Sequence, residues 1–156
     1  MQEVIELLKK KRLTISTMES CTGGGVVNAL TNVPGASEVL KFSAVTYSNE
    51  YKVKMGVSKD IIDKYSVYSI ETAREMALNI SKFTNSSLGV GVTGKLYRVD
   101  ENNLVGDNNK VFISIYDSSS NEYFDKEMII QDIPRDKNKA IIIDAIEELL
   151  LKILSR

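Results

Sequence analysis

Apolar side chains recur at helical spacing in three long segments of the chain. The first covers residues 4–12 and ends in a run of four cations, which suits the carboxyl end of a helix. The second begins after Ser69, a good N-cap residue, and carries its apolar stripe over 73–80. The third follows Pro134 and repeats apolar residues from 142 to 153. Shorter helices are predicted at 26–31, 36–40, 49–56 and 58–65.

Between these helices lie segments typical of strands. Residues 13–18 and 41–47 are rich in β-branched and apolar side chains. Residues 87–94 form an apolar run, as expected of a central strand, and the glycines within it indicate close packing against a helix or another backbone. Residues 111–116 and 122–130 are predicted to form a hairpin with its turn at 117–121. The segment 95–109 is polar, lacks periodicity and is predicted to be a long loop.

This succession of elements predicts an α/β protein, a three-layer α/β/α sandwich with a mixed, mostly parallel sheet. With 156 residues, the chain is expected to form a single domain over 1–156. The strand at 122–130 is expected at an edge of the sheet, which makes a homo-oligomer a further expectation.

Composition then narrows the possible functions. The formal net charge is −1, from 20 basic and 21 acidic residues, which argues against a nucleic-acid-binding surface. No apolar run approaches the ~20 residues of a membrane span, and the first residues do not resemble a signal peptide, so we expect a cytoplasmic protein that makes no membrane contact. The single cysteine, Cys21, excludes a disulfide framework. The absence of histidine excludes a serine or cysteine nucleophile activated by histidine, and zinc sites with imidazole ligands.

One stretch, Ile15 to Gly25, stands out as a candidate active site. A strand breaks there into Glu-Ser-Cys-Thr-Gly-Gly-Gly and continues into a helix. Such a turn exposes side chains and backbone N–H groups at a sheet edge, where they can bind a phosphate or a developing oxyanion. It matches neither the phosphate-binding loop that ends in Gly-Lys-Ser/Thr nor the dinucleotide fingerprint. The alternative is structural, with Ser20 or Thr22 acting only as a helix N-cap.

Several blocks of residues resemble one family in order and spacing. They are Glu-Ser-Cys-Thr-Gly-Gly at 19–24, Asn-Val-Pro-Gly-Ala-Ser at 32–37, Tyr-Ser-Asn-Glu-x-Lys at 47–52, Gly-Val at 56–57, Ser-Ile-Glu-Thr-Ala-Arg-Glu-Met-Ala at 69–77 and Val-Thr-Gly at 92–94. Together they are similar to the C-terminal domain of the CinA (competence-damage-inducible) family. The resemblance covers nearly the whole chain.

The resemblance implies an amidase that converts nicotinamide mononucleotide to nicotinic acid mononucleotide and ammonia, with no cofactor and no metal. It implies Ser20 as the nucleophile, with Tyr47 and Lys52 as its activating partners. Thr93 and Arg135 resemble further substrate-contacting positions. The full set of predicted substrate-binding residues is Glu19, Cys21, Thr22, Gly23, Gly24, Asn49, Thr93, Gly94 and Arg135.

The residue chemistry is compatible with this assignment. In the absence of histidine, a neutral lysine amine can activate a serine. Because the pKa of a free lysine is near ~10.4, burial or a neighbouring cation must lower it first. Tyr47 could relay the serine proton or orient Lys52, and Cys21 is expected to be a small buried side chain.

The chain departs from the family pattern after Thr93-Gly94. The family usually continues with Ile-Ala-Gly-Pro and a glycine-rich loop, whereas this chain has Lys-Leu-Tyr-Arg-Val-Asp at 95–100. Loss of glycine at a ligand-facing turn means loss of close backbone approach, but Lys95 and Arg98 could bind a phosphate instead. Two interpretations therefore stay open, a working amidase and a catalytically silent member that binds a nucleotide or a protein partner through the same pocket.

Overall fold

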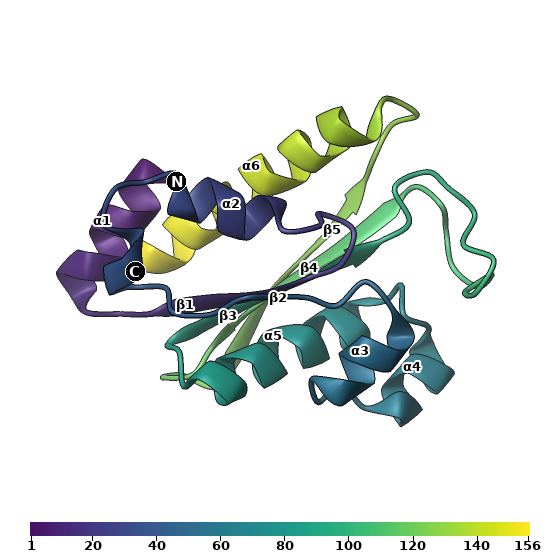
Figure 1. The fold of residues 1–156 in the computed structure, drawn as a ribbon, viewed down its shortest axis with the longest axis horizontal. Coiled ribbons are helices and arrows are strands. Elements are labelled where there is room, and N and C mark those ends of the chain that lie inside the picture. Colours follow the sequence, from purple (N-terminus) through teal and green to yellow (C-terminus); the bar gives the residue numbers. More distant parts are fainter.

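A five-stranded sheet with the order β2-β1-β3-β4-β5 lies between two layers of helices in the computed structural model, which describes residues 1–156 (Figure 1). The strands are β1 (Ile15–Glu19), β2 (Ala44–Val45), β3 (Leu88–Gly94), β4 (Lys110–Asp117) and β5 (Glu122–Ile129). β1 pairs in parallel with β2 and β3, whereas β3, β4 and β5 pair antiparallel. The predicted mixed sheet is confirmed, and the hairpin supplies its antiparallel part.

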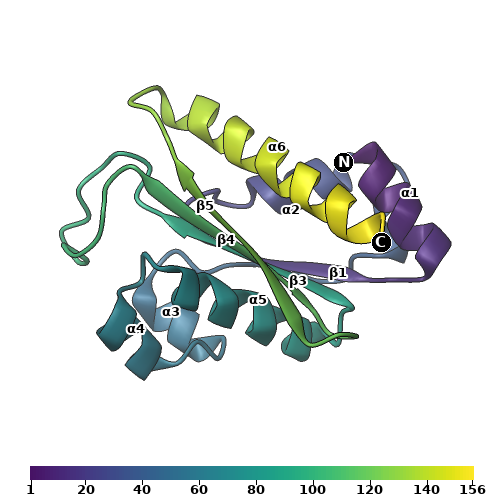
Figure 2. The same ribbon diagram turned by 180° about the vertical axis from the view of Figure 1, so that it is seen from behind.

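The helices divide evenly between the two faces of the sheet, as the two opposite views show (Figures 1 and 2). One face carries α1 (Gln2–Lys11), α2 (Gly25–Thr31) and α6 (Arg135–Leu154). The other carries α3 (Asn49–Lys54), α4 (Lys59–Tyr65) and α5 (Ile70–Thr84), and a 3₁₀ turn covers Ala36–Glu38. The predicted three-layer arrangement is therefore confirmed. None of these helices combines the length and the apolar character that crossing a membrane requires.

Each helical layer buries its own apolar cluster against the sheet. The larger cluster joins β1, β3 and β4 to the inner faces of α1, α2 and α6, with Val4, Leu8 and Ile146 fully buried. The smaller cluster lies on the other face and includes Met18 and Met76. Because both faces of β1 and β3 are covered, these strands are buried along their whole length, as parallel strands usually are.

α5 lies directly on the backbone of β3. A Cβ atom added at Gly89 would lie 2.1 Å from the carbonyl oxygen of Ala77, and one at Gly91 would lie 2.2 Å from that of Ala73. Glycine is therefore required at both positions. The expectation of close packing at the glycines of this strand is confirmed.

The strand expected over 41–47 is much shorter than predicted. Only Ala44–Val45 forms a regular strand, at the edge of the sheet, opposite Met18 and Glu19. Just before it, the N–H of Thr17 donates to the Ser43 hydroxyl at 3.1 Å, so a side chain replaces the next backbone partner. β propensity identified the segment, but regular pairing begins only after Ser43, whose hydroxyl takes the Thr17 N–H.

The three parallel strands end at the same edge of the sheet. β1 lies between β2 and β3, so the chain leaves it in one direction and returns on its other side. Ligands of α/β proteins bind at this kind of switch point, beyond the carboxyl ends of the strands. The segments that follow β1, β2 and β3 begin with Ser20, Thr46 and Lys95.

Candidate active site

Ser20 is the first residue after β1 and is held in place by the sheet. Its N–H donates to the carbonyl oxygen of Val92 on β3 at 3.1 Å, which extends the pairing of the two strands by one residue. The N–H groups of the next two residues, Cys21 and Thr22, donate to no other residue of the chain. Ser20 thus stands at the sheet edge beside two free backbone donors.

The capping group of α2 is Glu19, not Ser20 or Thr22. The Glu19 side chain is fully buried and accepts hydrogen bonds from the N–H groups of Val26 and Val27, both at 2.9 Å. It also accepts the Thr22 hydroxyl at 2.6 Å. The structural alternative for Ser20, an N-cap role, is therefore wrong, and its hydroxyl is free for other contacts.

That hydroxyl is in contact with Lys52. The Lys52 Nζ lies 3.1 Å from Ser20 Oγ and donates to the carbonyl oxygen of Thr46 at 2.7 Å. Lys52 is only 2% exposed and is the buried residue of α3. Burial lowers the pKa of Lys52 from 10.5 to about 8, so roughly a tenth of the amine is neutral at pH 7 and about half at pH 8.

Cys21 has the opposite character. The side chain is 2% exposed and belongs to the main apolar cluster. Burial raises the pKa of its thiol to about 12, so the thiol stays protonated and unreactive. As expected from the sequence, it is a small buried side chain.

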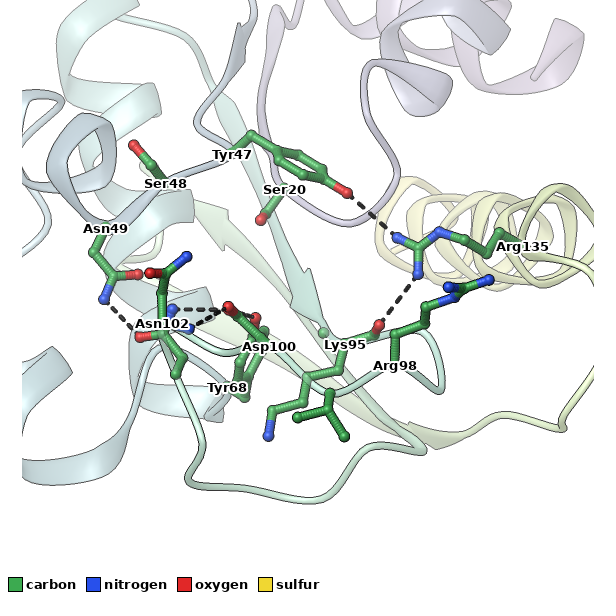
Figure 3. Close-up of a pocket in the computed structure, with 13 residues that line it drawn as sticks. Ser20, Tyr47, Ser48, Asn49, Tyr68, Lys95, Arg98, Asp100, Asn102 and Arg135 are labelled. Carbon is green, nitrogen blue, oxygen red and sulfur yellow. Dashed lines mark hydrogen bonds between the residues drawn. The ribbon is translucent and has the colours of Figure 1, made fainter.

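A polar cavity of about 710 Å³ opens above Ser20 at the carboxyl edge of the parallel strands (Figure 3). Only three of its 13 lining residues are hydrophobic. The 13 residues come from the segments that follow β1 and β2, the start of α3, the segment before α5, the end of β3, the loop 95–109 and the start of α6. The lining residues are Ser20, Tyr47, Ser48, Asn49, Tyr68, Gly94, Lys95, Arg98, Val99, Asp100, Asn102, Asn103 and Arg135.

Tyr47 and Arg135 form one wall of this cavity. Arg135 is the first residue of α6, and its Nη2 donates to the Tyr47 hydroxyl at 3.3 Å. Its Nη1 donates to the carbonyl oxygens of Lys95 and Leu96, both at 3.3 Å. Tyr47 makes no hydrogen bond with Ser20 or Lys52, so the structure shows it beside the pair and bonded to Arg135.

The loop 95–109 is held in shape by its own polar groups. Asp100 accepts hydrogen bonds from the Tyr68 hydroxyl, the Asn103 amide and the N–H of Asn102. Burial alone would raise the pKa of Asp100, but these donors outweigh burial and lower it. Lys95 Nζ donates to the carbonyl oxygens of Leu104 and Gly106 at 3.3 and 3.0 Å. The possibility that Lys95 binds a phosphate is therefore not met in this structure, because its amine fastens the loop.

The structure thus separates the predicted site residues into two groups. Ser20, Tyr47, Asn49, Gly94 and Arg135 line the cavity, with Lys52 behind Ser20. The others shape the turn or the strand end, and their contact with substrate stays a prediction. These are Glu19, Cys21, Thr22, Gly23, Gly24 and Thr93.

Thr93 illustrates the second group. It is fully buried, and its hydroxyl donates to the carbonyl oxygen of Val67 at 3.0 Å, which fixes the segment that leads into α5. Sequence reasoning did not identify Ser48, Tyr68, Asp100, Asn102 and Asn103 as lining residues. The pattern Asp-x-Asn-Asn at 100–103 is a turn signal that predicts local order, but it does not say what the turn faces.

The fold and the site define a three-layer α/β domain that carries a buried serine–lysine pair below a polar cavity. A family model described as the CinA C-terminal domain matches residues 1–149. The chain belongs to this family.

Sequence similarity to individual proteins supports this family assignment. The chain is 53% identical over 92 residues to a competence-damage inducible protein of Clostridium beijerinckii, and 49% identical over 92 residues to one of Caldanaerobacter subterraneus. Each match covers 58% of this chain but only 22% of the relative, so the chain corresponds to a small part of these longer proteins.

Solved structures match almost the whole chain. The competence/damage inducible protein CihA of Agrobacterium tumefaciens has a TM-score of 0.89 at 27% identity, and the match covers 99% of this chain and 92% of that one. A CinA superfamily protein of Escherichia coli has a TM-score of 0.88 at 21% identity over 97% of this chain and 87% of its own. The second likeness concerns the fold alone.

Proposed function

We propose that this domain hydrolyses the carboxamide of nicotinamide mononucleotide, releasing nicotinic acid mononucleotide and ammonia, with Ser20 as nucleophile. The observation that carries the proposal is the buried Lys52 amine, 3.1 Å from the Ser20 hydroxyl, with its pKa lowered to about 8. A lysine in this state is a competent general base for a serine. The resemblance to the family supplies the substrate.

In the proposed reaction, the Lys52 amine carries out every proton transfer that accompanies bond making or bond breaking at the acyl carbon. Neutral Lys52 accepts the Ser20 proton while Oγ attacks the amide carbon. The resulting ammonium returns this proton to the leaving nitrogen, which departs as ammonia. The same amine then takes a proton from water as the water oxygen attacks the acyl carbon, and it returns this proton to Ser20 Oγ as the ester bond breaks. The nicotinic acid product loses its own proton to solvent and leaves as the carboxylate. The Thr46 carbonyl oxygen, 2.7 Å from Nζ, stabilises Lys52 in its charged form at the intermediate stages.

Backbone donors support the charge that develops on the amide oxygen. The N–H groups of Cys21 and Thr22 follow the nucleophile directly and donate to no other residue of the chain. Donors fixed in this way stabilise an oxyanion without reorganisation, and losing one typically costs ~10²–10³-fold in rate. In this proposal, the glycine turn serves the oxyanion rather than the phosphate.

The test is ammonia release from nicotinamide mononucleotide by the wild type and by Ser20→Ala and Lys52→Met variants. We expect turnover to fall by ~10³-fold or more in each variant, because nucleophile and base act as a unit. Lys54→Met, on the same helix but exposed, is the matched control and should keep its activity. Activity that survives Ser20→Ala would refute the mechanism.

The same assay separates the enzyme from a silent binding protein. Saturable binding of the nucleotide without ammonia release, in folded protein, would favour the family member that only binds a ligand. Neither binding nor release would remove this substrate from consideration altogether.

The pH dependence of kcat/KM provides a second check. The base must be neutral to accept the serine proton, so kcat/KM should decrease below the Lys52 pKa of about 8 and level off above it. The rate between pH 6 and 9.5 measures this directly. A flat profile across that range would mean that no group of this pKa acts in the reaction.

A further inference from the structure

Two guanidinium groups in the cavity have no acidic partner. Arg98 is exposed at the cavity surface, and its guanidinium donates to no residue of the chain. Arg135 donates only to neutral oxygens, the carbonyls of Lys95 and Leu96 and the Tyr47 hydroxyl. The third lining cation, Lys95, is buried and committed to loop carbonyls. Two full positive charges therefore face the cavity without compensation.

One backbone oxygen joins these two arginines. The carbonyl oxygen of Lys95 accepts the backbone N–H of Arg98 at 3.4 Å and the Nη1 of the Arg135 guanidinium at 3.3 Å. This shared acceptor ties the start of the 95–109 loop to the first turn of α6. In Figure 3 the side chains of Arg98 and Arg135 lie at the same end of the cavity, on the side of the Lys95 carbonyl. The two guanidinium groups therefore lie at one end of the cavity, where a single anion can reach both.

The negative charge of the cavity lies elsewhere. Asp100 is its only lining carboxylate, and it is engaged by Tyr68, Asn102 and Asn103. In the view of Figure 3, Asn49 and Asn102 lie on the side opposite Arg135, and Ser20 lies between. The cavity is therefore polarised, with a cationic end and an end of amides and one bonded carboxylate.

We propose that Arg98 and Arg135 together bind the phosphate group of the substrate while its carboxamide faces Ser20. The proposal rests on the proposed function for the identity of the substrate, but the anion site follows from the two arginines alone. Guanidinium groups suit phosphate because their N–H donors match two of its oxygens at once. Arg98 is carried by the loop, so it makes the 95–109 loop the element that selects phosphorylated substrates.

The experiment compares two substrates that differ only in the phosphate, nicotinamide mononucleotide and nicotinamide riboside. Arg98→Gln should lower kcat/KM for the mononucleotide by about 10- to 100-fold, the usual worth of hydrogen bonds to a charged group, and leave the riboside unchanged. Arg98→Lys should recover part of the loss, because it keeps the charge without the planar fork. The control is Lys137→Gln, which removes an exposed charge from α6 that does not line the cavity.

Binding of ribose 5-phosphate, measured by calorimetry, separates this proposal from the proposed function. Binding that Arg98→Gln weakens and Lys137→Gln preserves would support the phosphate site even in a protein that releases no ammonia. Equal loss for the mononucleotide and the riboside would show that Arg98 only shapes the loop, and would overturn the proposal. Unchanged affinity for the mononucleotide and for ribose 5-phosphate in Arg98→Gln would overturn it as well.

Discussion

Lys52 is the residue at which activity and stability are most directly opposed. Its amine is almost completely buried, with one backbone carbonyl and one hydroxyl as partners and no carboxylate. A charged group in such surroundings disfavours folding unless it loses its proton. A lowering of the pKa from 10.5 to about 8 corresponds to roughly 3 kcal/mol against the charged form. The general base thus reduces the stability of the fold that holds it.

Lys52→Met is therefore expected to make the protein more stable at pH 7 while abolishing activity. The gain should be about 1–2 kcal/mol, smaller than the full effect of the pKa because Ser20 and the Thr46 carbonyl lose their donor. Urea denaturation at pH 7 measures it, with Lys54→Met on the exposed side of α3 as the control.

The gain should also depend on pH. Between pH 8 and 10.5 the unfolded chain keeps the Lys52 proton while the folded chain releases it, so the wild type becomes more stable as pH rises. The advantage of Lys52→Met is therefore complete below pH 8 and shrinks toward pH 10.5. An advantage that is constant over this range would show that the amine titrates normally in the folded state.

Leu96 and Tyr97 adopt a backbone conformation that suits glycine. Their φ angles are 50° and 65°, and the two residues differ in burial, since Leu96 is 1% exposed and Tyr97 is 41% exposed. Bulky residues in the left-handed region cost of the order of 1 kcal/mol each. The turn after β3 therefore has left-handed backbone angles at two residues that are not glycine, and the burial of the Leu96 side chain offsets part of the strain.

These two positions make a matched pair for mutation. Tyr97→Gly relieves strain and loses little packing, so its free energy of unfolding should change by less than about 1 kcal/mol, in the stabilising direction. Leu96→Gly relieves the same strain but empties a buried site, and should destabilise by about 2–4 kcal/mol. Denaturant titrations of both variants measure the two free energies of unfolding. Similar losses of stability in the two would contradict the left-handed backbone conformation at these positions.

At the scale of elements, the packing of α5 on β3 determines how close two layers can lie. Gly91→Ala would place a Cβ 2.2 Å from the Ala73 carbonyl oxygen, so helix and strand would have to separate. We expect a loss of about 2–3 kcal/mol or more in stability.

The matched control is Gly25→Ala, which is also tight, with its nearest contact at 2.9 Å. That contact is the tip of the flexible Ile143 side chain, which can rotate away, so the variant should be nearly neutral. Thermal unfolding of both variants tests the difference. A harmless Gly91→Ala would mean that α5 lies farther from the sheet.

The sequence predicted elements well wherever the periodicity was long. The stripe over 73–80, the run over 87–94 and the hairpin around 117–121 all form as expected, because burial of these patterns leaves few alternatives. The two-residue length of β2 could not be predicted, because β propensity does not show that the Ser43 hydroxyl takes the Thr17 N–H in place of a backbone partner.

Within the site, the role of Glu19 likewise depends on contacts that its own sequence pattern does not reveal. Its sequence position beside Ser20 suggested substrate contact, but its carboxylate turns back to cap α2. A cap formed seven residues ahead of its N–H partner, across a glycine turn, does not match the short-range capping patterns that a sequence reveals. The contact between Ser20 and Lys52, by contrast, was expected from their order in the resemblance and is present in the structure.

At the scale of the whole molecule, Cys21 offers a single native probe of how the fold opens. It is the only cysteine, it lies next to Ser20, and it belongs to the main apolar cluster. An alkylating reagent reacts with the thiolate, and burial both hides the thiol and raises its pKa to about 12. The native protein should therefore be labelled only through states in which the turn has opened.

The dependence of labelling on denaturant tells which opening is required. The Glu19 hydrogen bonds and the two-sided cover of β1 tie the turn to the core, so we expect exposure of Cys21 to require global unfolding. Labelling at pH 8 should then be slower than that of a free thiol by at least ~10⁴-fold, and its free energy should fall with urea as steeply as that of overall unfolding. Labelling that is fast and insensitive to urea would contradict this, because it would place a local opening at the residue beside the nucleophile. The proposed oxyanion donors, the N–H groups of Cys21 and Thr22, would then be mobile in the resting protein and could not act as a fixed site.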